Sequence, residues 1–167
     1  MPPIACLVRA AQPKDVAALV RMKLLLAKAE HAEHAVRATE QDWLRDGFGP
    51  NARFSAFIAE LDGVPVGMIT CNERYYTGWP EPAIYVGDLF VEPRLRRHGV
   101  ARALLGRVAA HAIARGSPMI ELTVRDDNAA RDFYRRCGFQ LVEECVNYVA
   151  GAPALAELAA GALVPQA

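Results

Sequence analysis

The stretch Ile84–Val91, IYVGDLFV, and the segment Arg94–Ala101, RLRRHGVA, decide how this chain folds. The first is an apolar run of strand length, and the residues after the second continue as an amphipathic helix to about Arg115. At a helix start the backbone N–H groups have no intrahelical acceptor and the helix dipole adds positive potential, so phosphates bind there readily. Gly99 and Ala101 carry almost no side chain, which lets an anion approach the backbone closely. The sequence therefore predicts an anion-binding turn between a buried strand and a helix.

The composition is that of a globular domain without a strong net charge. The chain has 167 residues, 53% of them hydrophobic, which suits one domain with a proper core. Its 19 basic and 19 acidic side chains cancel, so we expect no general attraction to nucleic acid or to a membrane surface. No run is long and apolar enough to span a bilayer, and no signal peptide is expected. The four cysteines lack C-x-x-C spacing, which is typical of reduced thiols in the cytoplasm.

Hydrophobic periodicity predicts seven strands and about four helices. The strands are expected at Cys6–Arg9, Phe54–Glu60, Val64–Asn72, Ile84–Val91, Met119–Val124, Phe139–Val142 and Cys145–Val149. The helices are expected at Asp15–Ala29, Thr39–Gly47, Val100–Arg115 and Asn128–Cys137, with a further short helix at Ala154–Ala160. Between them lie a hairpin turn at Asp62-Gly63 and a loop at Tyr75–Pro82. Hairpins combined with βα crossovers imply an α/β (α+β mixed) fold, with a central mixed, mostly antiparallel sheet covered by helices.

Two motifs resemble the GNAT (Gcn5-related) N-acetyltransferase family. Arg96–Ala101, RRHGVA, is similar to the family's Arg/Gln-x-x-Gly-x-Gly/Ala signature, and Asn128–Phe139, NAARDFYRRCGF, is similar to its second motif at the spacing that the family uses. The resemblance covers Val8–Val149. It implies the GNAT fold, a seven-stranded twisted sheet splayed between its fourth and fifth strands, here Ile84–Val91 and Met119–Val124. It also implies that the pantetheine arm of acetyl-CoA lies in that gap.

The resemblance further implies how the chain is organised and what it does. We expect a single N-acetyltransferase domain over residues 1–167, with an apolar C-terminal tail at 151–167. The family is frequently dimeric, and an apolar tail often covers a partner subunit, so we expect a homodimer. The implied activity is transfer of an acetyl group from acetyl-CoA to a primary amine of a small molecule by direct attack. Two alternatives stay open, namely acetylation of a protein or peptide amine, and a catalytically inactive CoA-binding sensor domain.

Acetyl transfer to an amine needs a proton acceptor for the amine, stabilisation of the thioester oxygen and a proton donor for the leaving thiolate. The resemblance assigns the donor to Tyr134, which is otherwise an aromatic on an apolar helix face. It assigns the oxygen to backbone N–H groups of Leu89, Phe90 and Val91. The remaining expected cofactor contacts are Asn128, also a plausible N-cap, on the pantetheine arm, and the pyrophosphate turn of Arg96, Arg97, His98, Gly99, Val100 and Ala101.

Asp88 is the candidate base or amine anchor, because a carboxylate inside a strand is costly unless it is paired. An Arg or backbone partner is the alternative reason for its position. The surrounding run also resembles the diamine acetyltransferases, which carry a catalytic Glu immediately before this Asp. Gly87 stands there in this chain, which moves deprotonation to Asp88 or to an ordered water.

Three aromatic residues, Tyr75, Tyr76 and Trp79, are the candidate walls of the acceptor site, since aromatic faces attract ammonium groups. Packing of the loop onto the domain is their alternative role. The run Glu30–His34 contains two histidines but no further ligand cluster, so a solvated helix face is expected, with contacts to the acceptor site as the alternative, and no metal is expected. Cys137 reads as structural, because no His is placed to activate it. The sequence does not name the acceptor.

Overall fold

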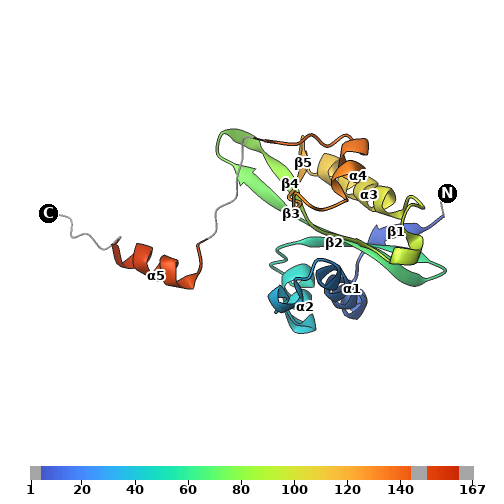
Figure 1. The fold of residues 1–167 in the computed structure, drawn as a ribbon, viewed down its shortest axis with the longest axis horizontal. Coiled ribbons are helices and arrows are strands. Elements are labelled where there is room, and N and C mark those ends of the chain that lie inside the picture. Colours follow the sequence, from blue (N-terminus) through green and yellow to red (C-terminus); the bar gives the residue numbers. More distant parts are fainter. Residues whose placement is uncertain (1–4, 144–149, 162–167) are drawn as a thin grey trace. The chain divides into compact units, whose positions relative to one another are not determined.

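Five strands form one sheet in the part of the chain that the computed structural model describes, residues 5–143 and 150–161 (Figure 1). Their spatial order follows the sequence: β1 (Leu7–Ala10), β2 (Ser55–Leu61), β3 (Val64–Tyr76), β4 (Trp79–Val91) and β5 (Ile120–Leu122). Strands β1 to β4 are antiparallel neighbours, and β5 joins β4 in parallel. A parallel neighbour needs a crossover, which helix α3 (Val100–Ala114) supplies. The expected mixed, mostly antiparallel sheet is confirmed.

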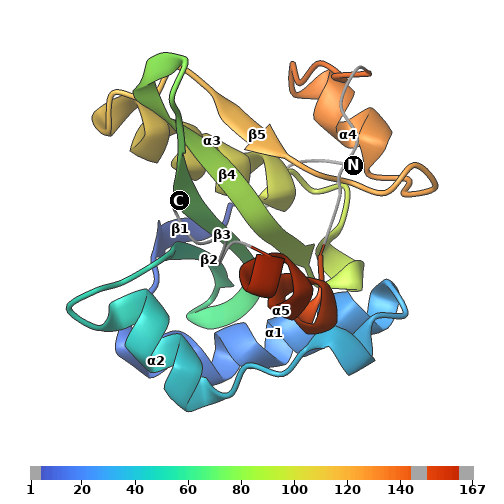
Figure 2. The same cartoon turned by 90° about the vertical axis from the view of Figure 1, so that its left-hand side faces the viewer.

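Helices cover both faces of this sheet (Figures 1 and 2). Helices α1 (Val16–Ala29) and α2 (Glu40–Phe48) lie on one face, and α3 lies on the other. The core under α1 and α2 consists of side chains from both layers, namely Val16, Leu19, Met22, Trp43, Ala56, Ile58, Met68 and Phe90. Residues two apart in a strand point to the same face of the sheet, so Asp88 lies on the same face as Phe90. The α1 face of β4 therefore carries both core residues and the candidate base.

The start of α2 shows the expected capping box. Thr39 Oγ1 accepts a hydrogen bond from the Asp42 N–H at 3.3 Å, and the Thr39 N–H donates to Asp42 Oδ2 at 2.9 Å. The helix continues past Gly47 to Phe48, with Gly49 as its C-cap, so the predicted end at Gly47 was slightly early.

The chain divides into two compact units, residues 1–128 and residues 129–167. The first contains the whole sheet and helices α1 to α3, and the second contains α4 (Arg131–Arg136) and α5 (Ala152–Gly161). Helix α5 includes the predicted tail helix. Helix α4 is shorter than predicted, because it begins at Arg131 rather than Asn128 and ends at Arg136. That residues 1–167 fold as a single domain stays a prediction.

The prediction of seven strands was wrong, since the described residues contain five. Phe139–Val142 is not a strand, and Leu141 and Val142 are 53% and 62% exposed. A short apolar run becomes a strand only when a neighbouring strand takes up its hydrogen bonds, and none pairs with this segment among the described residues. The other predicted strand, Cys145–Val149, lies outside the described residues.

The predicted loop at Tyr75–Pro82 is instead the end of a long hairpin. Strands β3 and β4 continue to a turn at Thr77-Gly78, and Tyr75 pairs with Pro82 in register. Two prolines suggested a loop, but proline is tolerated at a sheet edge. This part of β4 is an edge, because β5 pairs only with Ile84–Val86.

Candidate active site

The parallel pairing of β4 with β5 ends abruptly within β4. It runs from Ile84↔Ile120 to Val86↔Leu122, whereas β4 continues to Val91. Over Gly87–Val91, no strand among the described residues lies on that side of β4 (Figure 2). Alternate backbone groups of this segment therefore have no partner strand on that side among the described residues. The split falls between the two strands for which the family resemblance implies it.

A β-bulge at Gly87 begins the split. Thr70 faces Asp88 and Cys71 faces Val86, so Gly87 is the additional residue on β4. An added Cβ on Gly87 would lie 3.2 Å from Thr70 Oγ1, which is tighter than most real contacts. The glycine therefore suits the close approach of two strands at this point. Because a bulge shifts the side-chain alternation by one residue, it also aims Asp88 at the α1 face.

Asp88 has two side-chain partners, one on α1 and one on β3. Lys23 Nζ donates to Asp88 Oδ1 at 2.5 Å, with 30% of the Lys23 side chain and 16% of the Asp88 side chain exposed. The Thr70 hydroxyl accepts a hydrogen bond from the Asp88 N–H at 3.0 Å and donates to Asp88 Oδ2 at 3.2 Å. The alternative of a basic partner for Asp88 thus applies, with Lys23 in place of an Arg.

Sequence reasoning assigned no site role to Lys23 or Thr70. The signal for Lys23 was present, because it interrupts the apolar stripe of α1 that Leu19 and Ala27 define. A charge on a buried stripe needs a partner on the facing layer. Thr70 left no comparable signal, since threonine is common in strands.

The turn after β4 has the backbone conformation of an anion cradle. Arg97 has φ of 67° and Gly99 has φ of 87°, both in the left-handed region. Such conformations in a non-glycine residue concentrate at functional sites. The first α-helical hydrogen bond joins the Ala103 N–H to the Gly99 carbonyl at 3.0 Å. The backbone N–H groups of Val100, Ala101 and Arg102 therefore have no acceptor within the helix. The expected residues of the pyrophosphate turn are thus contiguous at the start of α3.

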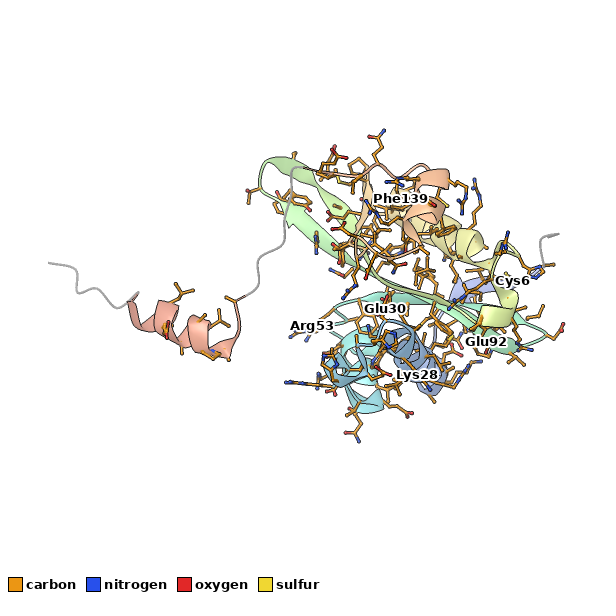
Figure 3. All side chains as sticks on the ribbon, in the orientation of Figure 1. Cys6, Lys28, Glu30, Arg53, Glu92 and Phe139 are labelled. Atoms are coloured by element: carbon orange, nitrogen blue, oxygen red, sulfur yellow. The ribbon has the colours of Figure 1, made fainter. Side chains whose placement is uncertain are left out.

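The charged side chains around this turn differ in how firmly hydrogen bonds hold them. The Arg96 Nε donates to the Val91 carbonyl at 3.3 Å, which ties the turn to the end of β4. Glu92, at the end of β4 (Figure 3), accepts from Arg94 Nε at 2.9 Å. The Arg97 side chain is exposed. Exposed guanidinium groups and oriented N–H groups are together able to bind an anion, and that this anion is the pyrophosphate of acetyl-CoA stays a prediction.

Tyr134 lies in α4, within the second unit, and is held by the end of that helix. The Phe139 N–H donates to the Tyr134 carbonyl at 3.1 Å and the Gly138 N–H donates to the Arg135 carbonyl at 3.0 Å, which is a Schellman motif. Gly138 has φ of 92°, as this motif requires. The rings of Tyr134 and Phe139 pack edge to face with centroids 5.7 Å apart. Tyr134 is therefore a half-buried aromatic with a fixed ring.

Asn128 is not the N-cap of α4, which begins after Ala130. Asn128 instead closes a turn in which its N–H donates to the Arg125 carbonyl at 3.0 Å. Its predicted contact with the pantetheine arm stays a prediction.

The candidate acceptor aromatics lie on the β3–β4 hairpin. Tyr75 is exposed, and the Tyr76 hydroxyl donates to Glu121 Oε2 at 2.7 Å, which raises the pKa of Tyr76. The side chain of Trp79 lies outside what the structure describes. Tyr76 is thus anchored to β5, while Tyr75 is available to a ligand.

No group of three or more His, Cys, Asp or Glu side chains among the described residues is placed to hold a metal ion. His31 adopts φ of 55° in the turn that ends α1. Burial raises the pKa of the Cys71 thiol to about 11, which keeps it protonated at neutral pH. That Cys137 is structural stays a prediction.

The sequence matches the model of the Acetyltransferase (GNAT) family over residues 19–139. The chain belongs to this family. It is accordingly an acyltransferase, and members of the family use acetyl-CoA. The chain is 32% identical to the thialysine N-epsilon-acetyltransferase of Sus scrofa, in an alignment that covers 79% of this chain and 82% of that one.

Solved structures show the same fold. An integron cassette protein from the mobile metagenome of V. cholerae has a TM-score of 0.77 at 22% identity, covering 93% of this chain and 98% of that chain. An aminoglycoside N-acetyltransferase in complex with CoA has a TM-score of 0.65 at 21% identity, covering 87% and 99%. Within the described residues, no helix has the length and apolar character needed to cross a membrane.

Proposed function

We propose that this protein transfers an acetyl group from acetyl-CoA to a primary amine of a small molecule by direct attack. The observation that carries the proposal is the end of β4–β5 pairing at Val86, immediately before Asp88 and the Arg96–Ala101 turn. It leaves an open strand edge between a carboxylate and an anion cradle. The similarity to a thialysine acetyltransferase, and the fold shared with an aminoglycoside acetyltransferase, support a small amine as the acceptor.

Each residue of the proposed site has a separate task. Acetyl-CoA supplies a thioester, which is activated toward attack by an amine. Arg97 and the N–H groups at the start of α3 bind its pyrophosphate, and Asn128 bonds its pantetheine arm. Of the backbone N–H groups of Leu89, Phe90 and Val91, those that face away from β3 point to the thioester oxygen and stabilise its developing negative charge.

Proton movements are assigned to two side chains. Asp88 holds the acceptor's ammonium group and takes its proton, directly or through a water, because an amine with a pKa near 10.4 is protonated at neutral pH. Gly87 offers no second carboxylate for this task. The Tyr134 hydroxyl then gives a proton to the leaving thiolate.

The test of this function is release of CoA from acetyl-CoA with a panel of amines: polyamines, amino acids, aminoglycosides and a lysine peptide. Turnover with a small amine supports the proposal. Turnover with the lysine peptide alone would show that the acceptor is a protein or peptide amine rather than a small molecule. Acetyl-CoA binding without turnover on any amine would show a sensor domain instead.

The Tyr134→Phe variant tests the acid step within this experiment. We expect kcat to fall about 10²–10⁴-fold, since a positioned general acid contributes this much. The phenylalanine ring preserves the packing on Phe139, so the melting temperature should stay close to that of the wild type. An unchanged kcat would remove Tyr134 from the mechanism.

We also propose that the enzyme is cytoplasmic and a homodimer. Cys6, Cys71 and Cys137 are free thiols, which suits a reducing compartment. Leu155 and Leu158 on α5 are exposed apolar side chains, of the kind that a partner subunit covers. A molar mass in solution equal to one chain would overturn the dimer.

A further inference from the structure

Lys23 is a cation on the inner stripe of α1, beside side chains that are fully buried. Leu19 and Met22 are 0% exposed, whereas Lys23 extends past them and ends 2.5 Å from Asp88. An ammonium group on an apolar stripe is costly unless it is paired, so Asp88 holds it there. The carboxylate that would receive an acceptor's amine is therefore already paired with the ammonium group of Lys23.

This charge changes which amines the site can favour. Two ammonium groups close together in a partly buried site repel each other. A diamine brings one ammonium group beside Lys23 and a second that needs another acid. Glu92, the next acid along the chain, is engaged by Arg94 at 2.9 Å and by Arg21 at 3.7 Å. Glu92 is therefore already paired and is not a free carboxylate for the second ammonium group of a diamine.

We propose that Lys23 selects acceptors of the amino-acid class, which carry a carboxylate near the reactive amine, over polycationic amines. This inference rests on the proposed function, since it assigns the acceptor of the same site. The acceptor's amine contacts Asp88 and its carboxylate contacts Lys23, so that four charges alternate in sign. Because Lys23 reaches Asp88 directly, a short chain between the acceptor's two groups suits the pair. Lys23 is thus a specificity-determining residue.

The experiment compares acceptors that differ only at the end remote from the reactive amine. 4-Aminobutyrate carries a carboxylate there, 1,4-diaminobutane an ammonium group, and butylamine neither. For the wild type we expect kcat/KM to be at least tenfold higher for 4-aminobutyrate than for the diamine. In Lys23→Met, which keeps the length of the side chain and removes its charge, we expect this ratio to reverse. In Lys23→Arg, which keeps the charge, the ratio should stay above one.

Lys28→Met is the matched control, because Lys28 is an exposed lysine on the same helix (Figure 3) and the described residues show no contact between it and Asp88. It should leave the ratio unchanged. Thermal unfolding of all three variants separates loss of fold from change of preference. If Lys23→Met lowers kcat/KM for every acceptor in the same proportion, Lys23 only positions Asp88 and the inference fails. An unchanged ratio of kcat/KM for 4-aminobutyrate to that for the diamine, at any level of activity, also overturns the inference.

Calorimetric binding of the same acceptors, with CoA present, separates this inference from the proposed function. If no amine is acetylated but 4-aminobutyrate binds and Lys23→Met shifts binding toward the diamine, selection by Lys23 stands and catalysis fails. If amines are acetylated but the wild type neither binds nor prefers the carboxylate, catalysis stands and selection by Lys23 fails.

Discussion

Two of the ion pairs that join helix α1 and its N-cap to the sheet differ in how many hydrogen bonds the carboxylate accepts. At the start of the helix, Asp15 accepts from two nitrogens of Arg9 at 2.7 and 3.0 Å and from the Gln12 N–H at 2.7 Å. Further along, Asp88 accepts from one lysine nitrogen at 2.5 Å and from one hydroxyl at 3.2 Å. Asp15 is 7% exposed, and Arg9 also bonds Glu60 at 2.6 Å.

The difference distinguishes a structural carboxylate from a functional one. A carboxylate has about four lone-pair sites, and a planar guanidinium fills two of them in fixed geometry. Asp15 is occupied in this way, and hydrogen bonding to Arg9 holds its pKa below the usual range. A lysine is a single, flexible cation that can move aside. Asp88 therefore keeps capacity for an acceptor that Asp15 does not have.

Replacing Asp88 should give the largest effect, and on activity rather than stability. Asp88→Asn removes the proton acceptor while keeping size and hydrogen bonding to Thr70, so we expect kcat/KM to fall about 10²–10⁴-fold. The urea midpoint should change little, because Lys23 can turn to solvent. Steady-state kinetics and urea unfolding on one preparation measure both. A loss of stability with retained kcat/KM would make Asp88 structural and remove the contrast with Asp15.

Replacing Arg9 should do the reverse. Arg9→Met leaves Asp15 and Glu60 without their shared partner at the junction of β1 and α1. Breaking a fully buried pair costs about 3–5 kcal/mol, and the partly buried Arg9 pairs should cost less than this but enough to lower the urea midpoint clearly. The kcat of the fraction that remains folded should match the wild type. Lys23→Met is the stability control and should cost well below that, and equal losses in the two variants would contradict the comparison.

The same contrast predicts a dependence of stability on pH. The Asp15 carboxyl has a pKa below its unfolded value of about 3.9, so its contribution is present above that pH and is lost as the pH falls through the lower, folded pKa. Asp15→Asn should therefore make the free energy of unfolding less steep in pH below about pH 4. Urea midpoints between pH 2.5 and about 6 for both proteins measure this difference. Parallel curves would mean that Asp15 does not titrate differently in the folded state.

Features formed by residues close together in the chain could be predicted from the sequence, and features formed by distant residues could not. The Arg96–Ala101 turn was predictable because glycine, arginines and a helix start lie together in the chain. The β4 split was predictable only through the family resemblance. The Lys23–Asp88 pair was not, since its members are 65 residues apart and meet only when α1 packs on the sheet. The hairpin at Tyr75–Pro82 was missed because two prolines outweighed the aromatic residues, although an edge strand accommodates them.

Replacing Thr70 should give the smallest effect and tests the comparison of Asp88 with Asp15. Asp88 has the Thr70 hydroxyl where a second charged partner could bind. This hydroxyl accepts from the Asp88 N–H at 3.0 Å and donates to the carboxylate at 3.2 Å, so it fixes the side chain at the bulge. Thr70→Val removes both bonds with little change of shape, at a cost of about 0.5–1.5 kcal/mol, or up to about tenfold in kcat/KM. Thr70→Ser keeps the hydroxyl and should retain most of the activity. If valine and serine variants have equal kcat/KM, the bulge alone orients Asp88. The position of the Asp88 carboxylate would then depend on Gly87 and Lys23. Its ability to accept a ligand would depend on the movement of Lys23 alone.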